Sequence, residues 1–294
     1  MIIIPGPAST ILGENVAKKL GVSMIKVESK IFPDGESYVR FTGNVEGKDV
    51  VIVQSTYPPQ DTHLIQLFLM IDNAKKLKAK NIVVVSPYLA YARQDKVFRS
   101  YEAVSIKTIL KIFESLDLNF LITVNIHEPK VFEDVNFRCL NLSAVKLLAE
   151  YFQNLNLKKP IAFAPDEKAI RMVKDVADMY GWDYGWFKKE RDKVTGEISM
   201  RCEGVFNVEG KDTIIFDDII STGGTTATAA KMLKDMGAKR VYSACVHPLL
   251  VGDAYEKIIR SGVEKIVATD TIPKNVSLVS VTPIIVEALK TLKF

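Results

Sequence analysis

Two adjacent carboxylates followed by small polar residues form the most informative segment of the chain. The apolar run 213–216 leads into Asp217 and Asp218, and a turn of serine, threonine and glycine comes next: Ser221, Thr222, Gly223, Gly224, Thr225 and Thr226. We expect a helix to begin at about Ala227. Glycine lets backbone N–H groups approach an anion closely, hydroxyls add donors, and a helix N-terminus adds a positive dipole. The turn therefore predicts a phosphate-binding loop.

Asp217 and Asp218 require a different ligand, because carboxylates repel phosphate. They accept hydrogen bonds, and the paired hydroxyls of a ribose are donors that lie about one sugar ring from its 5-phosphate. A phosphorylated pentose therefore satisfies both halves of the segment. The alternative is that the small residues only cap a helix, but two acids and six small residues exceed what a cap requires. Neither the P-loop nor the dinucleotide glycine fingerprint occurs in the chain.

Other polar residues follow other predicted strands, and ligands of open parallel sheets bind beyond the carboxyl ends of strands. His127 and Asp166 each follow an apolar run, and we expect them to serve a divalent metal. Oxygen ligands favour Mg²⁺, which keeps several waters and bridges substrate phosphates. His127 taken alone also fits a structural histidine. The basic run that contains Arg93, Lys96 and Arg99 fits either a solvated face or a phosphate contact, and its position after a strand favours the contact.

The elements that must position these residues alternate along the whole chain. Short apolar runs, typical of strands buried on both faces of a parallel sheet, lie at 50–54, 82–86, 120–126, 161–164, 213–216 and 241–246. Amphipathic stretches that predict helices lie at 64–77, 105–116, 143–155, 170–180, 226–236 and 254–261. This alternation predicts an α/β protein with parallel sheets flanked by helices. Both halves carry similar units, so we expect a domain boundary near residue 145.

The overall composition excludes several classes of protein. The chain has 294 residues, 48% of them hydrophobic and 25% charged, as in globular proteins. Its net charge of +4 is too small to indicate a nucleic-acid partner, and no apolar run is long enough for a membrane span. The start of the chain lacks the pattern of a secretion signal. Cys139, Cys202 and Cys245 are far apart and odd in number, which fits reduced thiols and a cytoplasmic location.

Taken together, the motifs resemble those of the ribose-phosphate pyrophosphokinase (phosphoribosyl pyrophosphate synthetase) family, over essentially the whole chain and in order. They are Phe32-Pro-Asp-Gly-Glu36, Tyr91-Ala-Arg-Gln-Asp-Lys96, His127, Pro165-Asp166, Lys189-Glu-Arg191 and the segment from Asp217 to Thr226. The last motif is shared with type I phosphoribosyltransferases. The first two are more specific and favour the synthetase family.

The resemblance implies two phosphoribosyltransferase-like domains, residues 1–145 and 146–294, related by duplication and sharing an active site. It implies that loop 221–226 holds the 5-phosphate of ribose 5-phosphate, while Asp217 and Asp218 approach the ribose hydroxyls. His127 and Asp166 would serve the Mg²⁺–ATP and diphosphate region. The catalytic cations would be two residues of a flexible loop, Lys189 and Arg191.

The resemblance also implies where ATP binds. Arg93 and Gln94 would contact ATP, with Arg93 near its phosphates. Phe32, Asp34 and Glu36 would recognise the adenine ring from a neighbouring subunit. A complete site would therefore require a homo-oligomer, at least a dimer.

Two positions depart from the family's pattern. Asn125 stands where the family commonly has an aspartate, so one negative charge is missing beside the expected metal histidine. Glu167 and Lys168 follow Asp166 where glycines are expected, which bears on how closely the backbone approaches a diphosphate.

The reaction that these motifs imply transfers the diphosphoryl group of ATP to the 1-hydroxyl of ribose 5-phosphate, for nucleotide biosynthesis. A phosphoribosyltransferase is one alternative, but it has no reason to carry the motifs at 32–36 and 93–96. A non-catalytic regulatory subunit is another, although such a chain would normally show a damaged phosphate loop. An α/β module that only binds a sugar phosphate is the third.

Overall fold

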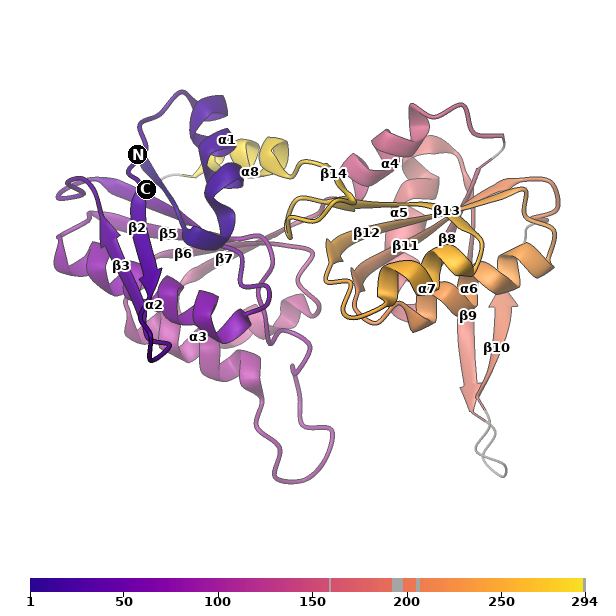
Figure 1. Cartoon of the computed structure of the whole chain (residues 1–294), viewed down its shortest axis with the longest axis horizontal. Helices are drawn as coiled ribbons and strands as arrows, with labels where there is room; N and C mark the ends of the chain where they lie inside the picture. Colours follow the sequence, from indigo (N-terminus) through magenta and orange to yellow (C-terminus); the bar gives the residue numbers. More distant parts are fainter. Residues whose placement is uncertain (159, 192–197, 205–206, 293–294) are drawn as a thin grey trace. The chain divides into compact units, whose positions relative to one another are not determined.

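The structure is a computed structural model that describes residues 1–158, 160–191, 198–204 and 207–292, with the backbone alone for 189–191 and 198–200. It contains two units, residues 1–143 with 281–294 and residues 144–280, each built on its own sheet (Figure 1). The expected α/β class is confirmed. The domains expected from the sequence divide the chain in order, into residues 1–145 and 146–294. In the structure the C-terminal helix belongs to the first unit instead of the second. Among the described residues, no helix has the length and apolarity to cross a membrane.

The first unit has a five-stranded parallel sheet in the order β1-β4-β5-β6-β7. Most of its strands are apolar runs buried along nearly their whole length, because helices cover both faces. An antiparallel hairpin of β2 and β3 forms a separate sheet. The elements are β1 Ile2–Pro5, α1 Thr10–Leu20, β2 Val27–Ile31, β3 Ser37–Phe41, β4 Asp49–Val53, α2 Gln60–Lys76, β5 Asn81–Ser86, α3 Ser105–Ser115, β6 Phe120–Val124, β7 Arg138–Leu142 and α8 Thr282–Thr291.

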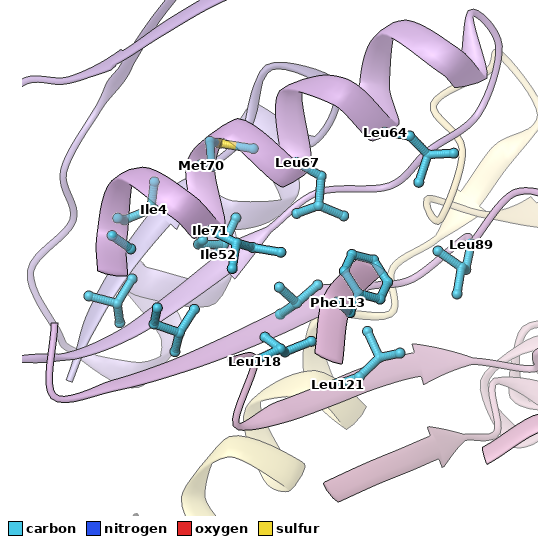
Figure 2. Packing of buried hydrophobic residues seen from close by; sticks show 14 of the residues in the cluster. Ile4, Ile52, Leu64, Leu67, Met70, Ile71, Leu89, Phe113, Leu118 and Leu121 are labelled. Atoms are coloured by element: carbon cyan, nitrogen blue, oxygen red, sulfur yellow. The ribbon is translucent and has the colours of Figure 1, made fainter. Parts of the chain in front are cut away.

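Helix α2 presents a stripe of apolar side chains to this sheet (Figure 2). Leu64, Leu67 and Ile71 recur at the spacing of one helix face, and they are buried together with Ile52 of β4 and Phe113 of α3. Helix α1 packs against β1 and α8. This core fixes the carboxyl ends of β4, β5 and β6, from which the polar loops of the first unit emerge.

The second unit has a seven-stranded sheet in the order β10-β9-β8-β11-β12-β13-β14, parallel except for the β9–β10 pair. One apolar core of this unit lies between the sheet and the helices α6 and α7. Helix α4 also packs on the sheet, where its Phe152 contacts the rings of Phe216 and Tyr242. The elements are α4 Val145–Gln153, β8 Ile161–Ala164, α5 Ile170–Tyr180, β9 Asp183–Arg191, β10 Ile198–Glu203, β11 Asp212–Ile220, α6 Gly224–Asp235, β12 Arg240–Pro248, α7 Ala254–Arg260, β13 Val263–Thr269 and β14 Ser277–Val279.

One order of strands and helices occurs twice along the chain. Apart from short 3-10 turns, the chain runs β1-α1-β2-β3-β4-α2-β5-α3-β6-β7-α4 and then β8-α5-β9-β10-β11-α6-β12-α7-β13-β14-α8. The sheet orders correspond, since β1-β4-β5-β6-β7 matches β8-β11-β12-β13-β14. The last helix of each series packs in the other unit, α4 in the second and α8 in the first. A duplicated half-sequence would produce this repeated order.

Candidate active site

Asp217 and Asp218 lie where β11 emerges from the core of the second unit. The strand is buried from Asp212 to Phe216 and becomes half-buried at the two acids. Asp217 pairs with Cys245 of the neighbouring strand β12. The carboxylate of Asp218 accepts a hydrogen bond from the N–H of Ile219 at 2.8 Å. The buried strand thus delivers both carboxylates to the carboxyl edge of the sheet.

Asp217 interacts electrostatically with both Asp218 and Asp166. Burial raises the pKa of Asp217 well above its usual range, and the charges of Asp218 and Asp166 raise it further. Asp166 follows β8, which lies beside β11 in the sheet. Neighbouring carboxylates repel one another, so a cation or hydroxyl donors placed among them would relieve the repulsion.

The carboxylate of Asp166 also caps the turn after β8. It accepts a hydrogen bond from the N–H of Lys168 at 3.0 Å, at the start of the short helix η3 (Glu167–Ala169). Glu167 lies 3.9 Å from the ammonium of Lys188 on β9. Both Glu167 and Lys168 are exposed. The turn that lacks the expected glycines is therefore held by a side-chain cap, and the long, exposed ion pair adds little.

The turn between β11 and α6 has the backbone of an anion-binding loop. Helix α6 begins at Gly224, earlier than the expected start at Ala227, so both final threonines lie in its first turn. Gly223 has a φ of +73°, in the left-handed region that glycine adopts at little cost. Thr226 is buried, and most of the other small residues keep exposed surface. A helix N-terminus behind small, accessible residues is suited to bind phosphate.

Lys189 and Arg191 lie at the end of β9, next to residues 192–197, which are outside the described residues. In the β9–β10 hairpin, Lys189 is opposite Met200 and Arg191 is opposite Ile198. The side chains of these two cations lie outside the described part of the structure. Their catalytic role stays a prediction.

Phe32, Asp34 and Glu36 share one turn at the tip of the β2–β3 hairpin. The N–H of Phe32 donates to the carbonyl of Glu36 at 2.8 Å, and the N–H of Glu36 donates to Asp34 Oδ1 at 3.2 Å. The Phe32 ring remains exposed, and the ammonium of Lys30 lies 4.3 Å from its centroid. A solvent-facing aromatic ring is able to stack on a purine. The neighbouring carboxylates are able to accept hydrogen bonds from the amino group of the purine.

Arg93 and Gln94 lie in the long loop between β5 and α3. Arg93 is exposed, and its positive charge lies close enough to lower the pKa of Tyr88, although burial raises that pKa more. Glu102, which the sequence did not single out, organises the loop. Its Oε2 accepts hydrogen bonds from the N–H groups of Phe98 and Arg99, both at 2.9 Å, and from Gln94 Nε2 at 3.4 Å.

A second anchor of this loop also escaped the sequence analysis. The hydroxyl of Tyr91 donates a hydrogen bond to Asp61 in the first turn of α2. Tyr91 itself has a φ of +65°, an uncommon conformation for a residue with a side chain. Asp61 and Tyr91 are far apart in sequence, so no local pattern reveals the pair. Its effect is to hold the backbone immediately before Arg93.

His127 follows β6 on a turn held by an asparagine of the next strand. Asn141 Oδ1 accepts hydrogen bonds from the N–H of Ile126 at 2.9 Å and from the Thr123 hydroxyl at 3.1 Å. Asn125 has a φ of +41°, which asparagine tolerates better than most residues. His127 is half-buried at the carboxyl edge of the first sheet.

The predicted metal residues are divided between the units, His127 in the first and Asp166 in the second. Within the described ranges, no three His, Cys, Asp or Glu side chains are grouped closely enough to hold a metal ion. Mg²⁺ takes one or two protein carboxylates together with waters and substrate phosphates. The acids after β8 and β11 have the donor chemistry for that kind of site.

Comparisons with known proteins extend over both units. Residues 1–116 match the N-terminal domain of ribose phosphate pyrophosphokinase, and residues 199–292 match the phosphoribosyl synthetase-associated domain. A ribose-phosphate pyrophosphokinase of Sulfurisphaera tokodaii is 40% identical over 286 residues, 97% of each chain. That of Methanothermobacter thermautotrophicus is 40% identical over 98% of this chain and 100% of the relative. The crystal structure of phosphoribosylpyrophosphate synthetase from Mycobacterium smegmatis superposes with a TM-score of 0.89 and 28% identity, covering 98% of this chain and 97% of that one.

Proposed function

The chain belongs to the ribose-phosphate pyrophosphokinase family, and we propose that its second unit holds ribose 5-phosphate while loops of its first unit hold ATP. The enzyme transfers the diphosphoryl group of ATP to ribose 5-phosphate and releases AMP. The product is 5-phosphoribosyl 1-diphosphate, the activated sugar of nucleotide biosynthesis.

The single observation that carries the sugar site is the run from β11 into α6. In our proposal, the loop 221–226 and the N-terminus of α6 bind the 5-phosphate, because their geometry suits an anion. Asp217 and Asp218 accept hydrogen bonds from the ribose hydroxyls, which the repulsion around Asp217 favours. The 1-hydroxyl is thereby held ready for attack.

ATP would be bound by the polar loops of the first unit. Arg93 carries an exposed guanidinium suited to the phosphates, and Gln94 lies beside it on the loop organised by Glu102. We assign adenine recognition to the hairpin turn with Phe32, Asp34 and Glu36, acting on a neighbouring subunit. This assignment makes the enzyme a homo-oligomer, at least a dimer, whose sites are completed across subunits.

We propose Mg²⁺ as the metal of this phosphoryl-transfer enzyme, with Asp166 and His127 on the protein side. The carboxylates after β8 and β11 fit a hard cation, because their mutual repulsion is relieved by positive charge. When bound, the ion would withdraw electron density from the phosphates and reduce their negative charge. The residues themselves supply oxygen and imidazole donors at the carboxyl edges of the two sheets.

The reaction requires position and positive charge more than proton transfer. The 1-hydroxyl oxygen attacks the β-phosphorus of ATP in line, the bond from that phosphorus to the α,β-bridging oxygen breaks, and AMP leaves. Lys189 and Arg191 would neutralise charge that builds on the transferring group and help exclude water, which would otherwise hydrolyse ATP. No side chain is assigned as a general base.

We also propose a cytoplasmic location. Cys139, Cys202 and Cys245 are free thiols, as is common in a reducing compartment. Burial raises the pKa of Cys139 to about 12 and that of Cys202 to about 11, so both remain thiols at neutral pH.

An assay of AMP release tests the proposed function. We expect purified protein to form AMP from ATP only when ribose 5-phosphate and Mg²⁺ are both present, and EDTA to abolish the reaction. A protein that instead consumes 5-phosphoribosyl 1-diphosphate with a nucleobase would be a phosphoribosyltransferase. A protein with neither activity would contradict the enzyme assignment.

A further inference from the structure

The backbone carbonyl groups of the phosphate loop are held by hydrogen bonds from the protein itself. The acceptors and their donors are Ile220 O with Leu250 N at 3.0 Å, Ser221 O with Val251 N at 2.9 Å, Thr222 O with Lys257 Nζ at 3.2 Å, Gly223 O with Ala227 N at 2.9 Å, and Gly224 O with Thr228 Oγ1 at 3.0 Å. A carbonyl that faces a phosphate repels it, whereas an N–H that faces it binds. Holding the carbonyl groups therefore favours a cradle of N–H groups.

The chain that follows β12 supplies three of these donors. Two are backbone N–H groups just before α7, and the third is the side-chain ammonium of Lys257 within α7. A Cβ built on Gly223 would lie 3.0 Å from the carbonyl oxygen of Ala254 and 3.0 Å from Ile258 Cδ1. Helix α7 thus lies directly against the back of the phosphate loop.

The peptide between Thr222 and Gly223 can turn over at little cost in backbone strain. Glycine adopts positive and negative φ with similar ease, so rotation of this peptide group costs little in backbone strain. Rotation would bring the Thr222 carbonyl oxygen toward the anion and carry the Gly223 N–H away from it. Lys257 holds that oxygen at 3.2 Å, and Asp253, 3.2 Å from the same ammonium, holds Lys257 in place.

We propose that Lys257 is a positioning residue for ribose 5-phosphate: its ammonium fixes the Thr222 carbonyl and so presents the Gly223 N–H to the 5-phosphate. Its positive charge behind the loop adds attraction for the anion. The inference rests on the proposed sugar site and extends it to a helix outside the loop. Lys257 acts on the substrate through the backbone, without being a catalytic residue.

The test compares Lys257→Met with Lys257→Arg and with a matched control. Methionine keeps much of the side-chain volume but has no donor and no charge, whereas arginine keeps both. The control is Lys234→Met at the other end of α6, because Lys234 Nζ also donates to a backbone carbonyl, that of Lys239 at 3.0 Å. All three proteins are purified as full chains, and their thermal unfolding is recorded.

We expect Lys257→Met to raise the KM for ribose 5-phosphate about tenfold, the effect of losing one hydrogen bond to a charged group. The KM for ATP and kcat should stay within about twofold of the wild type, since the reacting atoms are untouched. Isothermal titration with ribose 5-phosphate should show the same loss of affinity. Lys257→Arg should restore most of it, and Lys234→Met should leave it unchanged.

An unchanged ribose 5-phosphate affinity in Lys257→Met would overturn the inference, and so would an equal loss in Lys234→Met. A fall in kcat and in both affinities, with no rescue by arginine, would show a purely structural lysine and would also overturn it. Failure of the wild-type protein to bind ribose 5-phosphate would instead contradict the proposed function. The two failures are therefore distinguishable.

Discussion

Three carboxylates at the ends of β8 and β11 define the chemistry of the second unit at the scale of single residues. Burial raises the pKa of Asp217, and the charges of Asp218 and Asp166 raise it further. Such a carboxylate is stabilised by hydrogen-bond donors or by cations. The hydroxyl groups of a sugar would provide the donors, and a metal bound to a diphosphate would provide the cation. In our proposal, the adjacent loop binds the phosphate that carboxylates would repel. The two neighbouring segments would then match the two ends of ribose 5-phosphate.

Lys189 is predicted to act on the transition state. Lys189→Ala should lower kcat about 100-fold or more, because a positioned charge that meets developing negative charge is lost. The affinity for ribose 5-phosphate, measured by titration, should change little. The matched control is Lys188→Ala, which removes the neighbouring lysine that pairs with Glu167 and should leave kcat nearly unchanged. Equal losses in kcat and affinity would argue against a transition-state role.

Glu102 is predicted to support ATP binding through the loop that carries Arg93 and Gln94. Glu102→Ala removes the acceptor of three hydrogen bonds within that loop, so the KM for ATP should rise about five- to tenfold. The affinity for ribose 5-phosphate should not change. Glu133→Ala, at an exposed glutamate of the short helix η2 (Pro129–Asp134), is the control. Equal ATP affinity in both variants would show that Glu102 does not organise the site.

At the scale of elements, the structure ties β11 to β12 by an ion pair at the end opposite the active site. Burial alone would raise the pKa of Asp212, but hydrogen bonds from Arg240 and the N–H of Lys158, with the charge of Arg240, outweigh it and lower the pKa. The contact is two-pronged, at 2.8 Å and 2.6 Å from the guanidinium. A lowered pKa contributes stability above the unfolded value near 4, and this stability is lost as the pH falls through the folded value.

Asp212→Asn should therefore lower the free energy of unfolding by about 3 kcal/mol near neutral pH, as for a buried pair that loses one partner. The difference from wild type should shrink as the pH falls below about 4, where the Asp212 carboxylate of the unfolded chain takes up a proton, and it should vanish below the lowered pKa of the folded state. Urea denaturation at several pH values measures both effects. The control is Asp183→Asn, whose more exposed pair with Lys211 at 2.9 Å should cost less than about 1 kcal/mol. A pH-independent difference would contradict the assignment.

The sequence predicts six of the buried strands, misses the buried strand β1 (Ile2–Pro5), and predicts the polar elements poorly. Each predicted strand coincides with one of β4, β5, β6, β8, β11 or β12, because a strand covered on both faces must be a continuous apolar run. The hairpin strand β2 (Val27–Ile31) is mostly exposed and carries no such run. Helices α1 and α8 pack on each other from opposite ends of the chain, so nothing local predicts their contact. The contact between Tyr91 and Asp61 escapes for the same reason, since the two residues are 30 positions apart.

At the scale of the whole chain, the proposed phosphate loop lies in the second of the two repeated series of elements. The counterpart of β11 is β4, followed by residues 54–59 where the second unit has its glycine-containing turn. In the first unit this segment is engaged by the protein itself. The N–H of Thr56 donates to the carbonyl of Tyr88 at 2.8 Å, and the Thr56 hydroxyl accepts from the N–H of Ala90 at 2.7 Å. The polar groups of this segment are thereby occupied by hydrogen bonds within the protein, whereas most of the loop 91–102 is exposed.

Subunit complementation tests the proposal that Phe32 acts across subunits. Phe32→Ala and Lys189→Ala chains should each be nearly inactive, the first through weak ATP binding and the second through slow transfer. Co-expressed with different tags and purified by both, the mixed oligomer should regain activity, because a Lys189→Ala subunit lends its intact Phe32 to a partner with intact Lys189. A mixed oligomer no more active than its parents would place Phe32 in its own subunit's site.

The central claim is transfer of an intact diphosphoryl group to the sugar, and ³¹P NMR of the reaction tests it most directly. With ATP, ribose 5-phosphate and Mg²⁺, the wild-type protein should produce AMP and a sugar 1-diphosphate at equal rates, while the 5-phosphate resonance persists. Formation of ADP or free orthophosphate in place of these products, or no turnover of fresh substrates, would contradict the account.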